Sequence, residues 1–218
     1  MSETSWGASL RFMMRVRVLL LLVFLSATLG TACALPGGDD QTPEGAYYLW
    51  VQARQAGDID GCWRATHPEV QSLLGRWHQA ESDTLFKVTT MYPEARRASA
   101  LEVLEEGGRA RLPDPKALFA HLLTRGSGEA LAGLQLLGAR TSSVTVSEDN
   151  ATLLTLGGDT VTVRRFGERW AVSLAEDERS ALEALAAKAE SNFRRAESNV
   201  KRLRGVDQSE QSESPTGQ

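Results

Sequence analysis

The chain has 218 residues, of which 42% are hydrophobic and 24% charged, and its formal net charge at pH 7 is −4. These values are ordinary for globular proteins, so they exclude a collagen-like chain, a wholly disordered chain and a small disulfide-stapled protein. The length suits one domain with terminal extensions. A net negative chain without a basic patch is not typical of nucleic-acid binding, so we expect no nucleic-acid partner.

The N-terminal residues have the order of a secretory signal peptide. Arg11, Arg15 and Arg17 form a positively charged stretch, and an unbroken apolar run, VLLLLVFL, follows over residues 18–25. Small residues then lead to Cys33. A charged region, an apolar region and small residues before a cleavage point are the parts of such a peptide. We therefore expect residues 1–32 to be a signal peptide.

Residues 29–33, Leu-Gly-Thr-Ala-Cys, resemble the lipobox of bacterial lipoproteins. The resemblance implies a lipid on the thiol of Cys33, removal of residues 1–32 and the membrane as a partner. Ala34 stands where many inner-membrane lipoproteins have aspartate, so the resemblance implies the outer membrane, facing the periplasm. Two alternatives stay open. Residues 18–35 could form an uncleaved anchor helix, because about 20 residues span a bilayer, or the chain could undergo secretory cleavage without lipid.

The second cysteine and the residues after the lipobox suggest how the rest of the chain is divided. If Cys33 carries lipid, Cys62 has no partner for an internal disulfide, and we expect a buried, inert thiol. Residues 33–41 have the composition of a flexible tether. We then expect a folded domain over residues 42–175, a long amphipathic helix over 176–205 and a disordered acidic tail over 206–218.

The first part of this domain predicts helices. Thr42, followed by Pro43 and Glu44, is typical of a helix start, and apolar residues then recur at helical spacing. Glycine and proline residues mark the later boundaries. We expect helices from Thr42 to Gly57, from Asp58 past Cys62, from Thr66 to Gly75, from Pro93 to Glu106, from Asp114 to Thr124 and from Gly128 to Leu137.

After Gly138 the apolar residues recur with a period of two. Four short runs are separated by turn residues such as Glu148-Asp149-Asn150, which predicts a curved, four-stranded antiparallel meander with one apolar face. Helices followed by a meander indicate an α+β fold in which the helices cover that face. We expect Trp170 to lie under the first helix, facing Tyr47 or Trp50. The residues assigned to the apolar face are Val144, Val146, Leu154, Leu156, Val161, Val163, Trp170, Val172 and Leu174.

Two segments carry a second resemblance. TPEGAYYLWVQARQAGDIDGCWRATHPE, residues 42–69, and VTVRRFGERWAVSL, residues 161–174, are similar to the first helices and the last strand pair of nuclear transport factor 2-like (cystatin-like) lipoproteins. The resemblance implies a curved sheet wrapped around helices as a cone, with a cavity at its open end. Some members of that family are ketosteroid isomerases or dehydratases, and many are binding modules.

Motifs that would carry catalysis are not found in the sequence. His67, His78 and His121 lack the spacing of metal ligands, and no zinc, phosphate-binding or serine-nucleophile motif occurs. Asp60 or Asp83 could act as a base only in an apolar cavity, and such residues are more often helix caps or solvated side chains. We therefore expect no catalytic residue, no metal and no cofactor.

The C-terminal segment predicts a long helix with a heptad seam. Acidic residues at its start and basic residues towards Arg204 suit the helix dipole. The seam could pack on the preceding domain or meet an envelope protein; a homodimer is less favoured, because three of its seven residues are alanine. Two function classes stay open: a non-enzymatic envelope accessory or interaction module, which we favour, and a small-molecule-binding pocket protein. The seam residues are Leu182, Ala186, Ala189, Phe193, Ala196, Val200 and Leu203.

Overall fold

The computed structural model of the chain describes residues 37–105, 108–125 and 140–212. The expected signal peptide, the lipidation site Cys33, the expected helix over 128–137 and the end of the expected tail lie outside these residues. The chain from Gly37 onward forms one unit, in which helices and a four-stranded sheet pack together.

The first two helices begin and end at the predicted signals. The helix α2 (Pro43–Gln55) is capped by Thr42, whose hydroxyl accepts a hydrogen bond from the amide of Gly45 at 3.0 Å. After α2 the chain turns at Gly57, whose φ of +69° is a left-handed conformation that favours glycine. The helix α3 (Ile59–Arg64) is capped by Asp58, as predicted.

The third helix is longer than the sequence indicated. We expected it to end at Gly75, but α4 (Pro68–Met91) continues for four more turns beyond that glycine. A glycine inside a helix costs about 1 kcal/mol, and the buried face of α4 continues on both sides of it. The helix ends where Tyr92 turns extended before Pro93, as expected for a residue that precedes proline. The buried residues of α4 are Val70, Leu73, Leu74, Trp77, Ala80, Thr84 and Val88.

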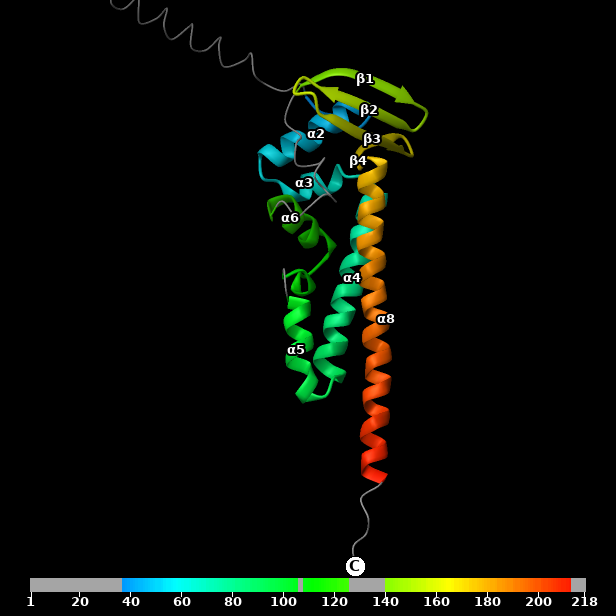
Figure 1. Cartoon of the computed structure of the whole chain (residues 1–218). Coiled ribbons are helices and arrows are strands. Elements are labelled where there is room, and N and C mark those ends of the chain that lie inside the picture. Colours follow the sequence, from blue (N-terminus) through cyan, green and yellow to red (C-terminus); the bar gives the residue numbers. More distant parts are fainter. Residues whose placement is uncertain (1–36, 106–107, 126–139, 213–218) are drawn as a thin grey trace, which may run out of the picture. The chain divides into compact units, whose positions relative to one another are not determined.

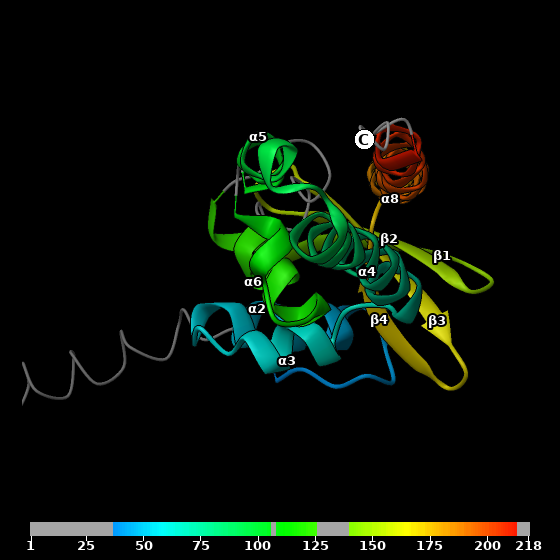
Figure 2. The ribbon, with the colours of Figure 1, turned by 90° about the horizontal axis from the view of Figure 1, so that it is seen from below.

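Two further helices start close to the predicted prolines. They are α5 (Glu94–Glu105) and α6 (Pro115–Arg125), with a short 3₁₀ turn, η1 (Arg109–Arg111), between them. Figures 1 and 2 show α5 beside the far half of α4. There, Val88, Tyr92 and Val200 form a cluster with partly buried side chains, namely Ala100, Leu101, Leu104 and Leu203.

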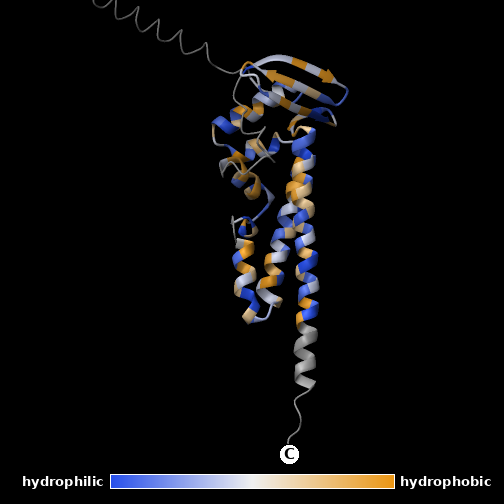
Figure 3. Ribbon diagram, in the orientation of Figure 1, coloured by the Kyte–Doolittle hydropathy of each residue, from blue (hydrophilic) through white to orange (hydrophobic). Residues whose placement is uncertain are grey.

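The sheet confirms the predicted α+β meander. Its strands are β1 (Thr141–Ser147), β2 (Asn150–Thr155), β3 (Thr160–Phe166) and β4 (Arg169–Ser173), paired antiparallel in that order. The helix α2 packs against β3 and β4 and covers the apolar face. Figure 3 shows hydrophobic and hydrophilic residues alternating along the strands.

The prediction of the buried face was correct for β3 and β4 and wrong for β2. Leu153 is fully buried, whereas Leu154 is 42% exposed and Leu156 is 69% exposed. The sequence of β2 places leucine on both faces, so its hydrophobic pattern alone does not select one. The register decides instead: Leu153 lies opposite Val144 on β1 and Val161 on β3.

The long helix α8 (Glu176–Ser212) extends for about 55 Å and runs parallel to α4. Contacts along the pair occur in the same order on both helices: Arg76 with Glu190 at 2.9 Å, then Lys87 with Glu197 at 3.2 Å. The helix therefore belongs to the same unit as the expected 42–175 domain. It also continues past the expected end at Gly205 to Ser212, so residues 206–212, expected to be disordered, are helical.

Replacing each of two neighbouring leucines of β2 tests which face is buried. We expect Leu153→Ala to lower the free energy of unfolding by about 2–5 kcal/mol, because it leaves a cavity in the core. Leu154→Ala, the matched control, should change it by less than about 0.5 kcal/mol, as exposed sites usually do. Denaturant unfolding measures both values. A larger loss for Leu154→Ala than for Leu153→Ala would restore the face assignment made from sequence.

Candidate functional site

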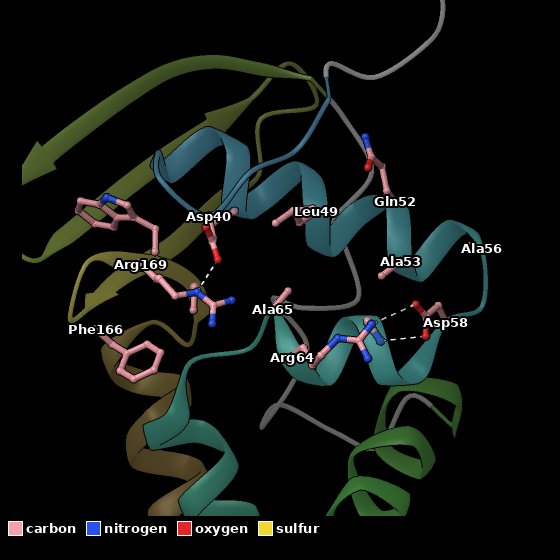
Figure 4. A pocket seen from close by; sticks show the side chains of 14 residues that line it. Asp40, Leu49, Gln52, Ala53, Ala56, Asp58, Arg64, Ala65, Phe166 and Arg169 are labelled. Carbon is pink, nitrogen blue, oxygen red and sulfur yellow. Dashed lines mark hydrogen bonds and ion pairs between the residues drawn. The ribbon is translucent and has the colours of Figure 1, made fainter.

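A pocket of about 410 Å³ lies between α2, α3 and the hairpin that joins β3 to β4. Figure 4 shows Leu49 and Ala53 of α2 on one side, Ala65 across from them, and Phe166 and Arg169 at the hairpin. Most of its lining is apolar, and this volume falls within the range of small-molecule sites. The apolar lining residues are Ala46, Leu49, Ala53, Ala56, Ala65, Phe166, Trp170 and Ala171.

Two arginines provide the positive charge of the pocket, and each has an aspartate partner. Nε of Arg169 donates to a carboxylate oxygen of Asp40, and Arg64 lies 3.8 Å from the carboxylate of Asp58. The hydrogen bond from Gln41, together with Arg169, lowers the pKa of Asp40 below its ordinary value. The side chains of Arg64 and Arg169 are both largely exposed. The pocket can therefore present guanidinium groups to an anion above an apolar floor.

Residues 37–41 reach this pocket as a docked segment. The carbonyl of Asp40 accepts a hydrogen bond from the amide of Trp170 at 2.8 Å. Gly38 lies so close to α2 that an added Cβ would sit 2.4 Å from the backbone nitrogen of Leu49. We expected residues 33–41 to be a flexible tether without packing, and for residues 37–41 this was wrong. The close approach of a glycine to a helix leaves no pattern in hydrophobicity, so composition did not reveal it.

Cys62 is buried, as predicted. Its Sγ lies 3.9 Å from the carbonyl oxygen of Trp50, and no part of the residue is exposed. Burial, with a smaller contribution from the charge of Asp58, raises the pKa of the thiol to about 11. A thiol that is protonated at neutral pH and closed to solvent is a poor nucleophile.

The three histidines lie on different helices or at their ends. Nδ1 of His67 accepts from the amide of Glu69 at 3.3 Å and so caps α4, while burial, with Arg164 nearby, lowers the pKa of His67. Nε2 of His78 lies 2.8 Å from the carbonyl oxygen of Leu112. His121 lies on α6. Residues 37–105, 108–125 and 140–212 contain no group of His, Cys, Asp or Glu side chains arranged for a metal ion.

The two aspartates considered as bases have polar partners. Asp60 bonds to the ammonium group of Lys116, which lowers the pKa of Asp60. Asp83 accepts a hydrogen bond from Gln79 at 2.9 Å. Neither aspartate lines the pocket of about 410 Å³ described above.

A cluster of charges lies where α8 begins, and only part of it can be read from the sequence. Glu69 contacts Arg164 of β3 and, at 3.2 Å, Arg179 of α8. Arg179 also contacts Glu183 at 3.0 Å and Glu176, and the hydrogen bond from Arg179 lowers the pKa of Glu176. The spacing of Glu176, Arg179 and Glu183 within one helix was a readable signal. The contribution of Glu69 was not, because it comes from a distant part of the chain.

The seam of α8 faces α4 over most of its length. Five of its residues are buried: Leu182, Ala186, Ala189, Ala196 and Val200. Phe193 is half-buried under the ammonium group of Lys87, which lies 4.8 Å from its ring centroid, and Leu203 packs on the Val88 cluster. These residues thus make intramolecular contacts, which is one of the two uses that the heptad spacing allows.

We compared the chain with protein-family models, with curated proteins and with solved structures, and no match was found.

Adding a methyl group to Gly38 tests the docking of residues 37–41. Gly38→Ala should push this segment off α2, so the amide of Trp170 loses its acceptor. We expect hydrogen exchange of that amide to quicken at least about tenfold, equivalent to about 1.4 kcal/mol. Gly37→Ala is the control, since an added Cβ there meets no atom within 4 Å. Equal protection of Trp170 in both variants would contradict the docking.

Proposed function

We propose that this protein is a membrane-anchored bacterial lipoprotein that serves as a non-enzymatic interaction module of the cell envelope. The observation that carries the proposal is where the folded unit begins. Gly38, five positions after Cys33, already packs closely against Leu49 of α2. Cleavage before Cys33 would therefore remove no residue of that unit and would leave the cysteine at its edge.

The short connection gives the anchor a physical role. An extended chain covers at most about 3.6 Å per residue, so a lipid on Cys33 would hold Gly37 within roughly 14 Å of the bilayer surface. Each buried CH₂ group of the lipid contributes about 0.8 kcal/mol. No helix of the described ranges is sufficiently long and apolar to cross a bilayer. We propose the outer membrane, with the protein facing the periplasm, because Ala34 stands where many inner-membrane lipoproteins have aspartate.

Packing favours interaction over catalysis. Tyr47 and Trp50 of α2 and Leu153 of β2 are fully buried, so large side chains occupy the space between α2 and the centre of the sheet, and the pocket is confined to one side of α2. The pocket lining includes no histidine or cysteine, and both of its carboxylates lie beside arginines. Large apolar side chains are instead exposed on the surface, among them Phe86, Val103 and Leu156.

Replacing the two cysteines separately tests the anchor. Cys33→Ser should move the protein from the membrane pellet to the soluble fraction and abolish incorporation of labelled palmitate. Cys62→Ser, the control, should leave both unchanged, because that thiol is buried. An uncleaved Cys33→Ser protein that stays in the membrane would establish the anchor-helix alternative. A wild-type protein that is cleaved but carries no label would establish secretory cleavage.

The pocket of about 410 Å³ favours a second candidate function, the binding of a small anionic amphiphile. A carboxylate could meet Arg64 and Arg169 while its alkyl chain lies on Leu49 and Trp170. We expect decanoate to bind in a calorimetric titration of the full chain, and Arg169→Gln to weaken binding about tenfold, as for the loss of one charge-assisted contact. Arg165→Gln, on a neighbouring residue outside the pocket lining, is the control. Decanoate that binds equally to both variants would exclude this site.

A further inference from the structure

In the part of the chain that the structure describes, one edge of the sheet is not covered by another segment. The strand β1 lies at the end of the strand order, and five of its seven residues are exposed. Its sequence, TSSVTVS, contains no charge and no proline. Proteins usually protect an exposed edge strand with lysine, proline or a covering segment, because its free backbone groups pair with other strands. No described residue pairs with the outer side of β1 between Ser143 and Ser147.

The opposite edge of the sheet is protected. Along β4, the amide of Trp170 donates to the carbonyl of Asp40 and the amide of Val172 donates to that of Ala65. The carbonyl of Val172 accepts from the amide of His67 at 2.8 Å. In the described part of the chain, one edge of the sheet is closed and the other is open. Pairing through the open edge uses the one edge that each copy has available, so the assembly stops at two copies and cannot extend into a fibre.

We propose that β1 pairs antiparallel with β1 of a second copy of this chain, which joins the two sheets edge to edge. Apolar side chains are exposed on both faces of this edge: Val146 of β1 is 54% exposed on one face, and Leu154 of β2 is 42% exposed on the other. Pairing would bring Val144 and Val146 of each copy against the other copy.

The turn after β1 determines which backbone groups are available. Ser147 and Asn150 flank a two-residue turn and form its closing pair. Hydrogen-bonded and non-hydrogen-bonded pairs alternate along antiparallel strands. The amide and carbonyl groups of Val144 and Val146 therefore point away from β2. If a two-fold axis passes beside Val144, the amide and carbonyl groups of Val144 bond to the carbonyl and amide groups of Val144 in the second copy.

Charge selects the antiparallel direction. Arg140 precedes β1, while Glu148 and Asp149 follow it, and all three are exposed. Antiparallel pairing brings the basic end of one strand to the acidic end of the other, at both ends of the interface. With the axis at Val144, Arg140 lies near Glu148 of the second copy, displaced by about one residue because β1 has a bulge between Thr141 and Ser143. Parallel pairing would bring like charges together, which is unfavourable.

The first test places a charge on the edge. The full chain carrying Cys33→Ser, in mild detergent, should show twice its mass of 23.7 kDa by light scattering. We expect this at about 100 µM, where a small interface still assembles. Thr145→Lys should give the monomer mass. Thr152→Lys, on the same face one strand inward, should leave the dimer intact. A parent protein that is monomeric would overturn the proposal, as would equal effects of the two lysines.

The second test exchanges the charges. Arg140→Glu or Glu148→Arg alone should weaken the dimer at least about tenfold, since each puts like charges opposite one another. The double variant should restore it. Within one copy these residues stand at opposite ends of β1, about 26 Å apart, so restoration requires a second copy. A double variant as weak as the single ones would exclude this register. A monomeric protein whose Thr145→Lys variant alone loses a co-purified envelope protein would assign the edge to that partner instead.

Discussion

Three backbone hydrogen bonds along the outer edge of β4 determine how the sheet fits against the N-terminal helices. They link the last strand to Asp40 and to the junction Ala65–His67. Because α4 starts directly after His67 and α8 starts shortly after β4, both helices leave from the same edge of the sheet. This common origin is the reason that they run parallel and side by side.

The charges near this origin then set how α8 lies on α4. Glu69, in the first turn of α4, contacts Arg179 in the first turns of α8, and Arg76 meets Glu190 further along. Exposed ion pairs contribute little stability individually. The buried seam residues of α8, including Leu182 and Ala186, supply most of the energy, so the charges act mainly on register.

The sequence predicted local features well and long-range ones poorly. Thr42, Asp58 and Pro93 mark helix ends because capping and proline geometry act within one turn of helix. The alternation from Thr141 onward revealed the meander for the same reason. By contrast, the continuation of α4 beyond Gly75 and the burial of Leu153 depend on neighbours far away in the chain. Two such neighbours are α8 and β3.

The candidate sites divide in the same way. The burial of Cys62 followed from its apolar surroundings in the sequence. The pocket between α2 and the β3–β4 hairpin could not be predicted from the sequence, because Asp40 and Arg169, which meet there, are 129 positions apart. The open edge of β1 was visible as an uncharged strand, but only the hydrogen bonds of β4 showed that the other edge is closed.

The closure of β4 also has a consequence for the order of folding. Its partners come from the beginning of the folded unit and the strand itself from much later, so these contacts have high sequence separation. Chains dominated by such contacts fold slowly, because the loop must close before the contacts form. The N-terminal helices therefore lack their main support until β4 has emerged. If the chain is exported as proposed, this order of folding would leave it loosely structured during translocation, and the fold would be completed afterwards.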